Sequence, residues 1–258
     1  MTTPTATRPE PAVANRWIAR RRAVAEPKAR LLCIPHVGGG GAVFNGWIDR
    51  LPPDVELCAV RFPGRENRLT EPLCEDWRTL LAQLEPVVTP LLDVPTVIVG
   101  HCSGSVLAYE LARRLRAGQG AGPVAVVLSS TPAPGLRDLD DLHHLMSQEE
   151  LLSRVVGYGG MSPAVLDDPE LMTMFERILR ADYRVVEELE YSPGPPLDIP
   201  IVVFGGRHDP FVSSDSLAAW ATATTADFSL HLIDADHFLL DEIGPRVAEA
   251  ISLLKERS

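Results

Sequence analysis

One stretch of the sequence constrains the fold more than any other. Between Pro95 and Arg114 the chain passes from an apolar run to a helical pattern through Gly100-His-Cys-Ser-Gly104. The apolar run predicts a strand that is buried on both faces of a parallel sheet. Beyond Gly104, apolar and charged residues repeat at 3.6-residue spacing, which predicts an amphipathic helix that ends at Gly118. The chain is therefore expected to make a sharp strand–turn–helix around residue 102.

The two glycines have the spacing of G-x-S-x-G, the nucleophile elbow of α/β-hydrolases, with Cys102 at the central position. Glycine is required on both sides because a Cβ would collide with neighbouring backbone in so tight a turn. Ser103 has no glycines at the matching positions and is a poor rival nucleophile. Close packing of a strand on a helix could also select two glycines, so the motif alone leaves a purely structural role open.

Composition and charge exclude several classes of protein. The chain has 258 residues, 45% of them hydrophobic, which suits one domain with a large core. No apolar run approaches the 18 residues of a transmembrane helix, and the first residues lack the apolar segment of a signal peptide. A net charge of −11 argues against nucleic acid or anionic membranes as the main partner.

The four cysteines are Cys33, Cys58, Cys74 and Cys102, and their spacing matches neither a disulfide framework nor a metal site. This pattern is typical of a reducing compartment, so a cytoplasmic location is expected. No metal or redox cofactor is implied by the sequence.

Strands and helices alternate along most of the chain, which predicts a doubly wound parallel sheet. Residues 17–24 could add a short edge element. Between about 136 and 195 the alternation stops and only helical patterns occur, among them a capping box at Ser147-Gln-Glu-Glu150 and a helix that starts at Asp168 or Pro169. We therefore expect a flexible N-terminal extension over residues 1–25 and a single α/β-hydrolase domain over 26–258, with a helical lid over about 136–195.

A glycine-rich loop follows the first buried strand, at Pro35-His-Val-Gly38 and the three glycines after it. It lacks the Lys and Ser/Thr of a P-loop, and no acidic residue ends the next strand as a dinucleotide fold requires. In α/β-hydrolases this loop supplies one backbone donor of the oxyanion hole, and the residue after the nucleophile supplies the other. Val37 N–H and Ser103 N–H are the predicted donors.

Three side chains stand in the order nucleophile, acid, base, each just after a predicted strand: Cys102, Asp209 and His237. This is the chain order of an α/β-hydrolase triad. Asp234 and Asp236 are rival acids, but they lie too close in sequence to His237 to orient its far nitrogen. The remaining histidines form two groups: His36, His101 and His208 are expected to support or line the site, whereas His143, His144 and His231 lack a strand-end context.

Five segments together resemble a known family: Ile34-Pro-His-Val-Gly-Gly39, Arg61-Phe-Pro-Gly-Arg-Glu-Asn-Arg68, Gly100-His-Cys-Ser-Gly104, Gly205-Gly-Arg-His-Asp209 and Asp236-His-Phe238. The chain is similar to the type II thioesterases that accompany polyketide synthases and nonribosomal peptide synthetases. The resemblance spans nearly the whole chain. It implies an α/β-hydrolase fold with a helical lid and hydrolysis of acyl thioesters from the phosphopantetheine arm of acyl or peptidyl carrier proteins.

The resemblance implies that Cys102 is the nucleophile, His237 the base and Asp209 the residue that orients it, with Val37 and Ser103 as oxyanion donors. The departure from the family is the thiol, because serine is usual at this position. A native cysteine and a serine replaced by cysteine to trap an intermediate would give the same sequence. An acyl group on sulfur stays activated, so transfer or cyclisation onto an amine or alcohol is an alternative to hydrolysis.

Two further alternatives remain open at this stage. One is a non-catalytic carrier-binding protein that keeps the fold, and the other is a general carboxylesterase. Carrier proteins are usually acidic, so Arg65, Arg68 or Arg207 could form a local basic docking face, although internal ion pairs would explain these arginines equally well.

Overall fold

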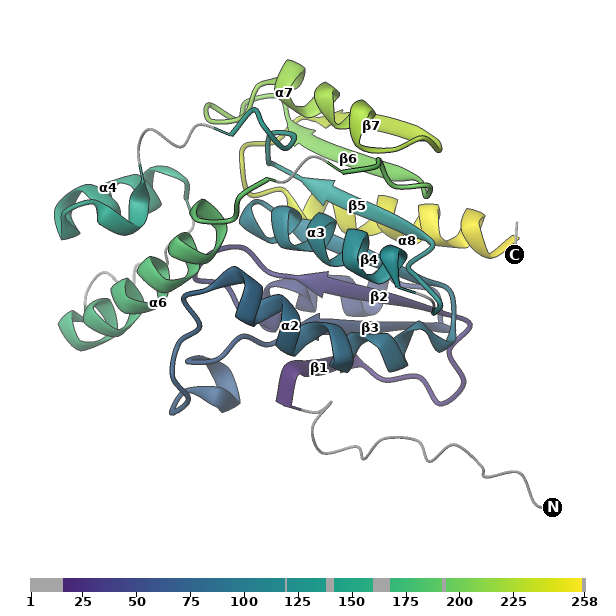
Figure 1. Ribbon diagram of the computed structural model, residues 1–258, viewed down its shortest axis with the longest axis horizontal. Helices are drawn as coiled ribbons and strands as arrows, with labels where there is room; N and C mark the ends of the chain where they lie inside the picture. Colours follow the sequence, from purple (N-terminus) through teal and green to yellow (C-terminus); the bar gives the residue numbers. More distant parts are fainter. Residues whose placement is uncertain (1–15, 119, 138–141, 160–167, 192–193, 257–258) are drawn as a thin grey trace.

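A seven-stranded sheet forms the centre of the computed structural model, which describes residues 16–118, 120–137, 142–159, 168–191 and 194–256 (Figure 1). The strand order is β1-β3-β2-β4-β5-β6-β7. Strands β2 to β7 pair in parallel and β1 pairs antiparallel with β3, which confirms the predicted mostly parallel sheet. The strands are β1 (Ile18–Arg22), β2 (Ala29–Ile34), β3 (Val55–Val60), β4 (Thr96–His101), β5 (Ala125–Ser129), β6 (Ile201–Gly206) and β7 (Phe228–Ile233).

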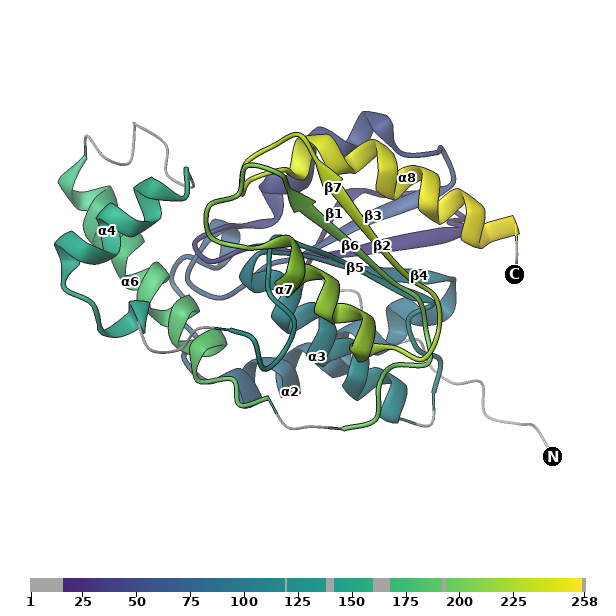
Figure 2. The ribbon, with the colours of Figure 1, turned by 90° about the horizontal axis from the view of Figure 1, so that it is seen from above.

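Helices cover both faces of this sheet, as Figure 2 shows from the sheet edge. Helices η1 (Gly41–Arg50) and α8 (Leu240–Glu256) share one face, and α2 (Trp77–Val88), α3 (Ser103–Ala117) and α7 (Ser214–Ala218) share the other. Each face has its own apolar core, because β2 to β5 are buried throughout and most of their side chains are apolar on both sides. The shorter 3₁₀ helices are η2 (Glu66–Arg68), η3 (Thr89–Asp93) and η5 (Ala219–Ala223). In the described part of the chain, no helix is both long and apolar enough to cross a membrane.

Between β5 and β6 the described residues form helices alone and no strand, as the sequence predicts. These are η4 (His143–Leu145), α4 (Gln148–Gly157) and α6 (Pro169–Glu187), which we call the helical insertion. The Ser147 capping box starts α4, and the Asp168 side chain accepts hydrogen bonds from the first turn of α6. The insertion extends beyond one end of the sheet (Figures 1 and 2), and its helices share a small apolar core of Leu151, Val155 and Leu179.

The predicted domain boundary at residue 25 is wrong. Ile18–Arg22 is the edge element that was expected within residues 17–24, and it pairs with Leu57 to Val60 of β3. The domain therefore begins at least at Ile18. Ile18 and Ala19 are buried, whereas three successive arginines make the rest of the strand resemble a solvated segment. Residues 1–15 of the predicted extension lie outside the described part of the chain.

Candidate active site

The turn between β4 and α3 has the strained geometry that the two glycines indicate. Cys102 lies at φ 52° and ψ −125°, a backbone conformation that residues other than glycine rarely adopt. A Cβ on Gly100 would collide with the backbone of Gly104 and Ser105, and a Cβ on Gly104 would collide with the carbonyl of Ile34. The Cys102 N–H donates to the Ser129 carbonyl at 2.8 Å, which holds the turn against β5. Contacts with the central sheet therefore hold the turn in this strained conformation.

The predicted acid and base meet beside this turn. His237 follows β7 and Asp209 follows β6, and His237 Nδ1 lies 2.8 Å from Asp209 Oδ2. The two side chains are 4% and 1% exposed, so solvent hardly screens the pair. The other oxygen of Asp209 accepts the N–H groups of Phe211 at 2.9 Å and Val212 at 3.2 Å. This carboxylate is thus fixed in the position from which it can orient the imidazole.

Cys102, Asp209 and His237 line one cleft of about 700 Å³. Nε2 of His237, the nitrogen opposite the Asp209 contact, is buried without a hydrogen-bond partner among the described residues. Burial disfavours the imidazolium, but a Cys102 thiolate and the Asp209 carboxylate outweigh burial and raise the pKa of His237 to about 10. The imidazolium form of His237 is therefore favoured in this cleft, against the effect of burial.

The rival residues lie elsewhere. Asp234 lies 2.6 Å from Nε2 of His208, and both side chains are more than half exposed. The prediction that His208 supports or lines the site is therefore wrong for the cleft, because its ring faces solvent while the next residue, Asp209, faces inward. His231 packs on the Phe204 ring, with centroids 5.2 Å apart.

His36 and His101 pack around Phe238 beside His237, as expected for supporting residues. Nδ1 of His101 is 2.9 Å from Ser129 Oγ. Burial, followed by repulsion from the neighbouring histidines, lowers the pKa of His101 well below its usual value. Burial likewise lowers the pKa of His36. Positive charge in this cluster is therefore concentrated on His237.

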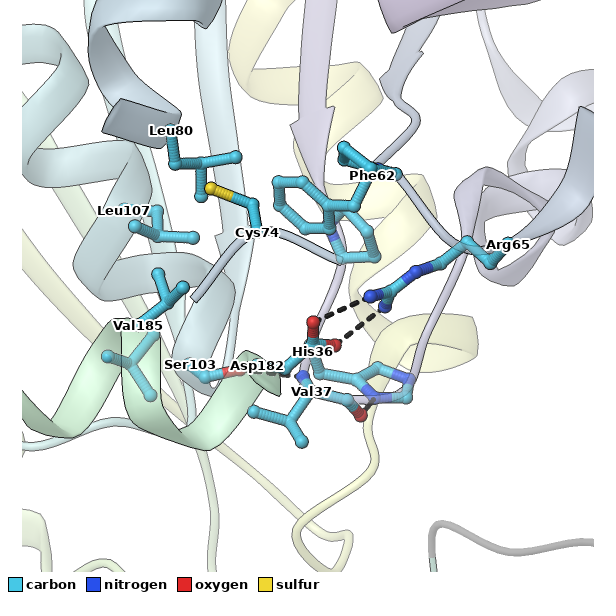
Figure 3. Close-up of a pocket in the computed structure, with 13 residues that line it drawn as sticks. His36, Val37, Phe62, Arg65, Cys74, Leu80, Ser103, Leu107, Asp182 and Val185 are labelled. Carbon is cyan, nitrogen blue, oxygen red and sulfur yellow. Dashed lines mark hydrogen bonds and ion pairs between the residues drawn. The ribbon is translucent and has the colours of Figure 1, made fainter. Parts of the chain in front are cut away.

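The two predicted oxyanion donors lie side by side, because Val37 N–H donates to Ser103 Oγ at 2.7 Å (Figure 3). Ser103 is the first residue of α3, where the helix dipole favours a negative charge. The Val37 N–H thus already has an acceptor, the Ser103 hydroxyl, at the place where an oxyanion would need this donor. If the predicted assignment is correct, an oxyanion would have to displace this hydroxyl before Val37 could donate to it.

Ser103→Ala is therefore expected to raise kcat/KM for an acyl thioester about two- to tenfold, the value of one neutral hydrogen bond. Steady-state hydrolysis of a thioester substrate measures this. Ser103→Thr keeps the hydroxyl and should retain the unmodified rate. A tenfold loss in Ser103→Ala would mean that the hydroxyl itself assists the reaction, which contradicts the expectation.

Several residues of the cleft were not among the individually predicted site residues. Tyr158 packs on the His237 ring at 5.2 Å, and Phe211 lies 4.1 Å from Tyr158. Tyr183 stacks on His143, with ring centroids 4.4 Å apart. His143, which has no strand-end context in the sequence, also lines the cleft. These contacts depend on how the helical insertion packs against the sheet. The rule that site residues follow strand ends does not predict that packing.

Glu187 fastens η4 to the end of α6. Its two oxygens lie 2.8 Å from His143 Nδ1 and 2.6 Å from His144 Nδ1, and they also accept both backbone N–H groups. Arg137 lines the same cleft and donates to the Val186 carbonyl. The wall of the cleft is thus lined by charged groups as well as apolar side chains.

Two of the three arginines considered for a docking face form internal ion pairs instead. Arg65 pairs with Asp182, and Arg68 pairs with Glu71 at 2.8 Å. Arg65 and Arg68 are both buried, so they offer no surface to a partner. Arg207 is exposed. Across the described ranges, no group of three or more His, Cys, Asp or Glu side chains could hold a metal ion.

Comparison with known proteins gives consistent matches over nearly the whole chain. The thioesterase domain family model matches residues 29–254. The gramicidin S biosynthesis protein GrsT of Aneurinibacillus migulanus is 32% identical over 228 residues, which cover 88% of this chain and 89% of GrsT.

Two solved structures are similar in fold. The type II thioesterase BorB from the borrelidin biosynthetic cluster has a TM-score of 0.83 and 33% identity, covering 93% of this chain and 97% of BorB. The RedJ thioesterase from the prodiginine biosynthetic pathway in Streptomyces coelicolor has a TM-score of 0.80 and 29% identity, covering 100% of this chain and 96% of RedJ. These likenesses confirm the predicted α/β-hydrolase fold.

Proposed function

Because the chain belongs to the thioesterase family, whose members hydrolyse thioesters, we propose that it releases acyl groups from the phosphopantetheine arm of a carrier protein in nonribosomal peptide or polyketide assembly. The observation that carries the proposal is the buried His237–Asp209 pair beside a cysteine on a strained elbow. The names of GrsT and BorB, which place those proteins in gramicidin S and borrelidin biosynthesis, support the choice of a carrier-bound substrate.

The first half-reaction transfers the acyl group to sulfur. His237 takes the proton of the Cys102 thiol, and the thiolate attacks the thioester carbonyl carbon. The carbonyl oxygen gains the negative charge and is stabilised by the backbone N–H groups of Val37 and Ser103. When the intermediate collapses, the carbon–sulfur bond to pantetheine breaks. The leaving thiolate receives the proton from His237, and acyl-Cys102 remains.

The second half-reaction restores the enzyme. His237 removes a proton from a water molecule, whose oxygen attacks the acyl-Cys102 carbonyl. Collapse breaks the bond to Cys102, the proton returns to sulfur, and a carboxylic acid leaves. Asp209 holds the imidazole in orientation through both halves and stabilises its positive charge. Neither half needs a metal ion or a redox cofactor.

The thiol favours a second candidate function. A thioester formed on Cys102 is about as activated as the substrate, so an amine or alcohol could replace water as the acceptor. In that case the same intermediate would give acyl transfer or cyclisation. The two functions share the first half-reaction and differ in the acceptor alone.

Carrier proteins loaded with acetyl, aminoacyl and longer acyl groups test the proposal. Intact-protein mass spectrometry should show loss of the acyl group from the carrier and a transient acyl adduct on Cys102. An added amine that captures the acyl group would favour transfer, and free acid alone would favour hydrolysis. A carrier that stays loaded, together with an enzyme that carries no adduct, would refute the function. Faster turnover of matched oxyesters would favour a general carboxylesterase.

A further inference from the structure

A carboxylate from the helical insertion reaches the loop that carries the oxyanion donor. Asp182 lies on α6, and its Oδ2 accepts the N–H of Gly38 at 2.8 Å. Gly38 directly follows Val37, whose amide is one of the two proposed donors. Figure 3 shows Asp182 beside this loop, between Arg65 and Val37. A residue from a distant segment thus binds the backbone next to the reaction centre.

Arg65 completes this contact from the other side. Its guanidinium binds the Asp182 carboxylate at two points, Nη1 to Oδ2 and Nη2 to Oδ1, each 2.6 Å long (Figure 3). The same Nη1 donates to the Gly39 carbonyl at 3.1 Å. The ion pair therefore holds an N–H group at residue 38 and a carbonyl at residue 39. The bidentate Arg65–Asp182 ion pair thus binds backbone groups of two adjacent residues in this loop.

The loop has little freedom to move while α6 is in place. Gly38 adopts φ +74°, and a Cβ there would come within 2.8 Å of Phe175 Cζ on α6. The Arg65 and Asp182 side chains are 8% and 13% exposed, so water cannot readily replace either partner. Displacement of α6 would break the Gly38 contact and leave Arg65 without its carboxylate.

From this arrangement we infer that Arg65 and Asp182 are positioning residues that hold the Val37 amide in place. The geometry of the oxyanion site then depends on the position of α6 against the glycine-rich loop. The inference rests on the proposed function, because it takes Val37 as an oxyanion donor. It assigns to the Arg61–Arg68 segment a role in transition-state stabilisation. The ion pair acts through the loop, because neither Arg65 nor Asp182 lines the cleft that holds Cys102, Asp209 and His237.

The chain offers a matched control on the same helix. Glu176 of α6 also binds an arginine, with Arg180 Nε and Nη2 each 2.8 Å from Oε1, and it is 18% exposed. Glu176 also accepts a hydrogen bond from Gln148, and among the described residues its polar contacts do not include the glycine-rich loop. Glu176→Gln therefore removes a similar charge and a similar ion pair without touching the predicted oxyanion donor.

Asp182→Asn tests the inference through two reactions of the full-length enzyme. Hydrolysis of an acyl-loaded carrier protein passes through an oxyanion, whereas alkylation of Cys102 by iodoacetamide does not. Asp182→Asn is expected to lower kcat about 10- to 100-fold, approaching the effect of losing one oxyanion donor, with KM changed less than about threefold. The rate of Cys102 alkylation should stay within about twofold of the unmodified enzyme. Glu176→Gln should leave both rates unchanged.

A second variant guards against local misfolding. Arg65→Lys keeps the charge but cannot make the bidentate contact, so it should give the same pattern as Asp182→Asn. The double variant should lose no more activity than the worse single variant, because both changes disrupt one unit.

Three results would overturn the inference: a kcat for Asp182→Asn within twofold of the unmodified value, alkylation that falls in parallel with kcat, or losses that add in the double variant. Failure of the proposed function is distinguishable, since the unmodified enzyme would then leave the carrier loaded.

Discussion

Replacement of Cys102 by alanine is expected to lower kcat/KM for an acyl-loaded carrier protein by about 10⁴-fold or more. The loss should be this large because the covalent route disappears entirely and no neighbouring group can replace the sulfur. Ser103, the next residue in the chain, accepts the Val37 N–H on its hydroxyl and is the first residue of α3. Steady-state hydrolysis and intact-protein mass spectrometry measure the effect, and the acyl adduct should vanish with activity.

Cys74→Ala is the matched control for this change. Cys74 is half-buried, lines the small pocket next to Ser103 in Figure 3, and donates to the Asp76 carbonyl at 3.4 Å. It should therefore keep full activity and the acyl adduct. Cys102→Ser retains a nucleophile and should accumulate an oxyester instead. If Cys102→Ala retained more than about 1% of the activity, the cysteine would not be the nucleophile.

The central strands and the elbow could be predicted because their signals are local. Short, mostly apolar runs mark β2 to β5, and the spacing of the two glycines marks the turn. A Cβ at Gly100 would collide within the turn itself, whereas a Cβ at Gly104 would collide with the carbonyl of Ile34 on the neighbouring strand β2. The meeting of Asp209 with His237 was predictable for a different reason. Parallel strands β6 and β7 end at the same edge of the sheet, so loops that follow them are neighbours.

The contacts of the helical insertion could not be predicted in the same way. Asp182 and Arg65 are 117 residues apart, and nothing near either residue indicates its partner. Their pairing depends on where α6 lies over the sheet, which neither helical periodicity nor strand order determines. For His208 the sequence suggests a role that the structure does not support. This residue follows β6, where site residues are expected, but its ring faces solvent.

His237→Ala is expected to lower kcat/KM by about 10⁴-fold and to slow alkylation of Cys102 near pH 7. In the proposed mechanism the ring accepts the proton of the thiol. Its imidazolium form is favoured by a Cys102 thiolate and by Asp209, which raise the pKa of His237 to about 10 against burial. Without it, alkylation should increase only as pH approaches about 8.5, the value of an ordinary thiol. His208→Ala, which removes an exposed histidine next to Asp209, should change neither rate.

The same pKa predicts how stability depends on pH. A folded-state pKa above the unfolded value means that the charged ring stabilises the fold fully below about pH 6.5. That contribution is lost as pH rises through about 10. The stability difference between the unmodified enzyme and His237→Ala, measured by urea unfolding, should therefore shrink steadily between these values. A constant difference would mean that the imidazolium is not held by the thiolate and Asp209. In the alkylation experiment, Cys33 and Cys58 should not react in place of Cys102. Burial raises the pKa of Cys58 to about 12 and that of Cys33 well above its usual value.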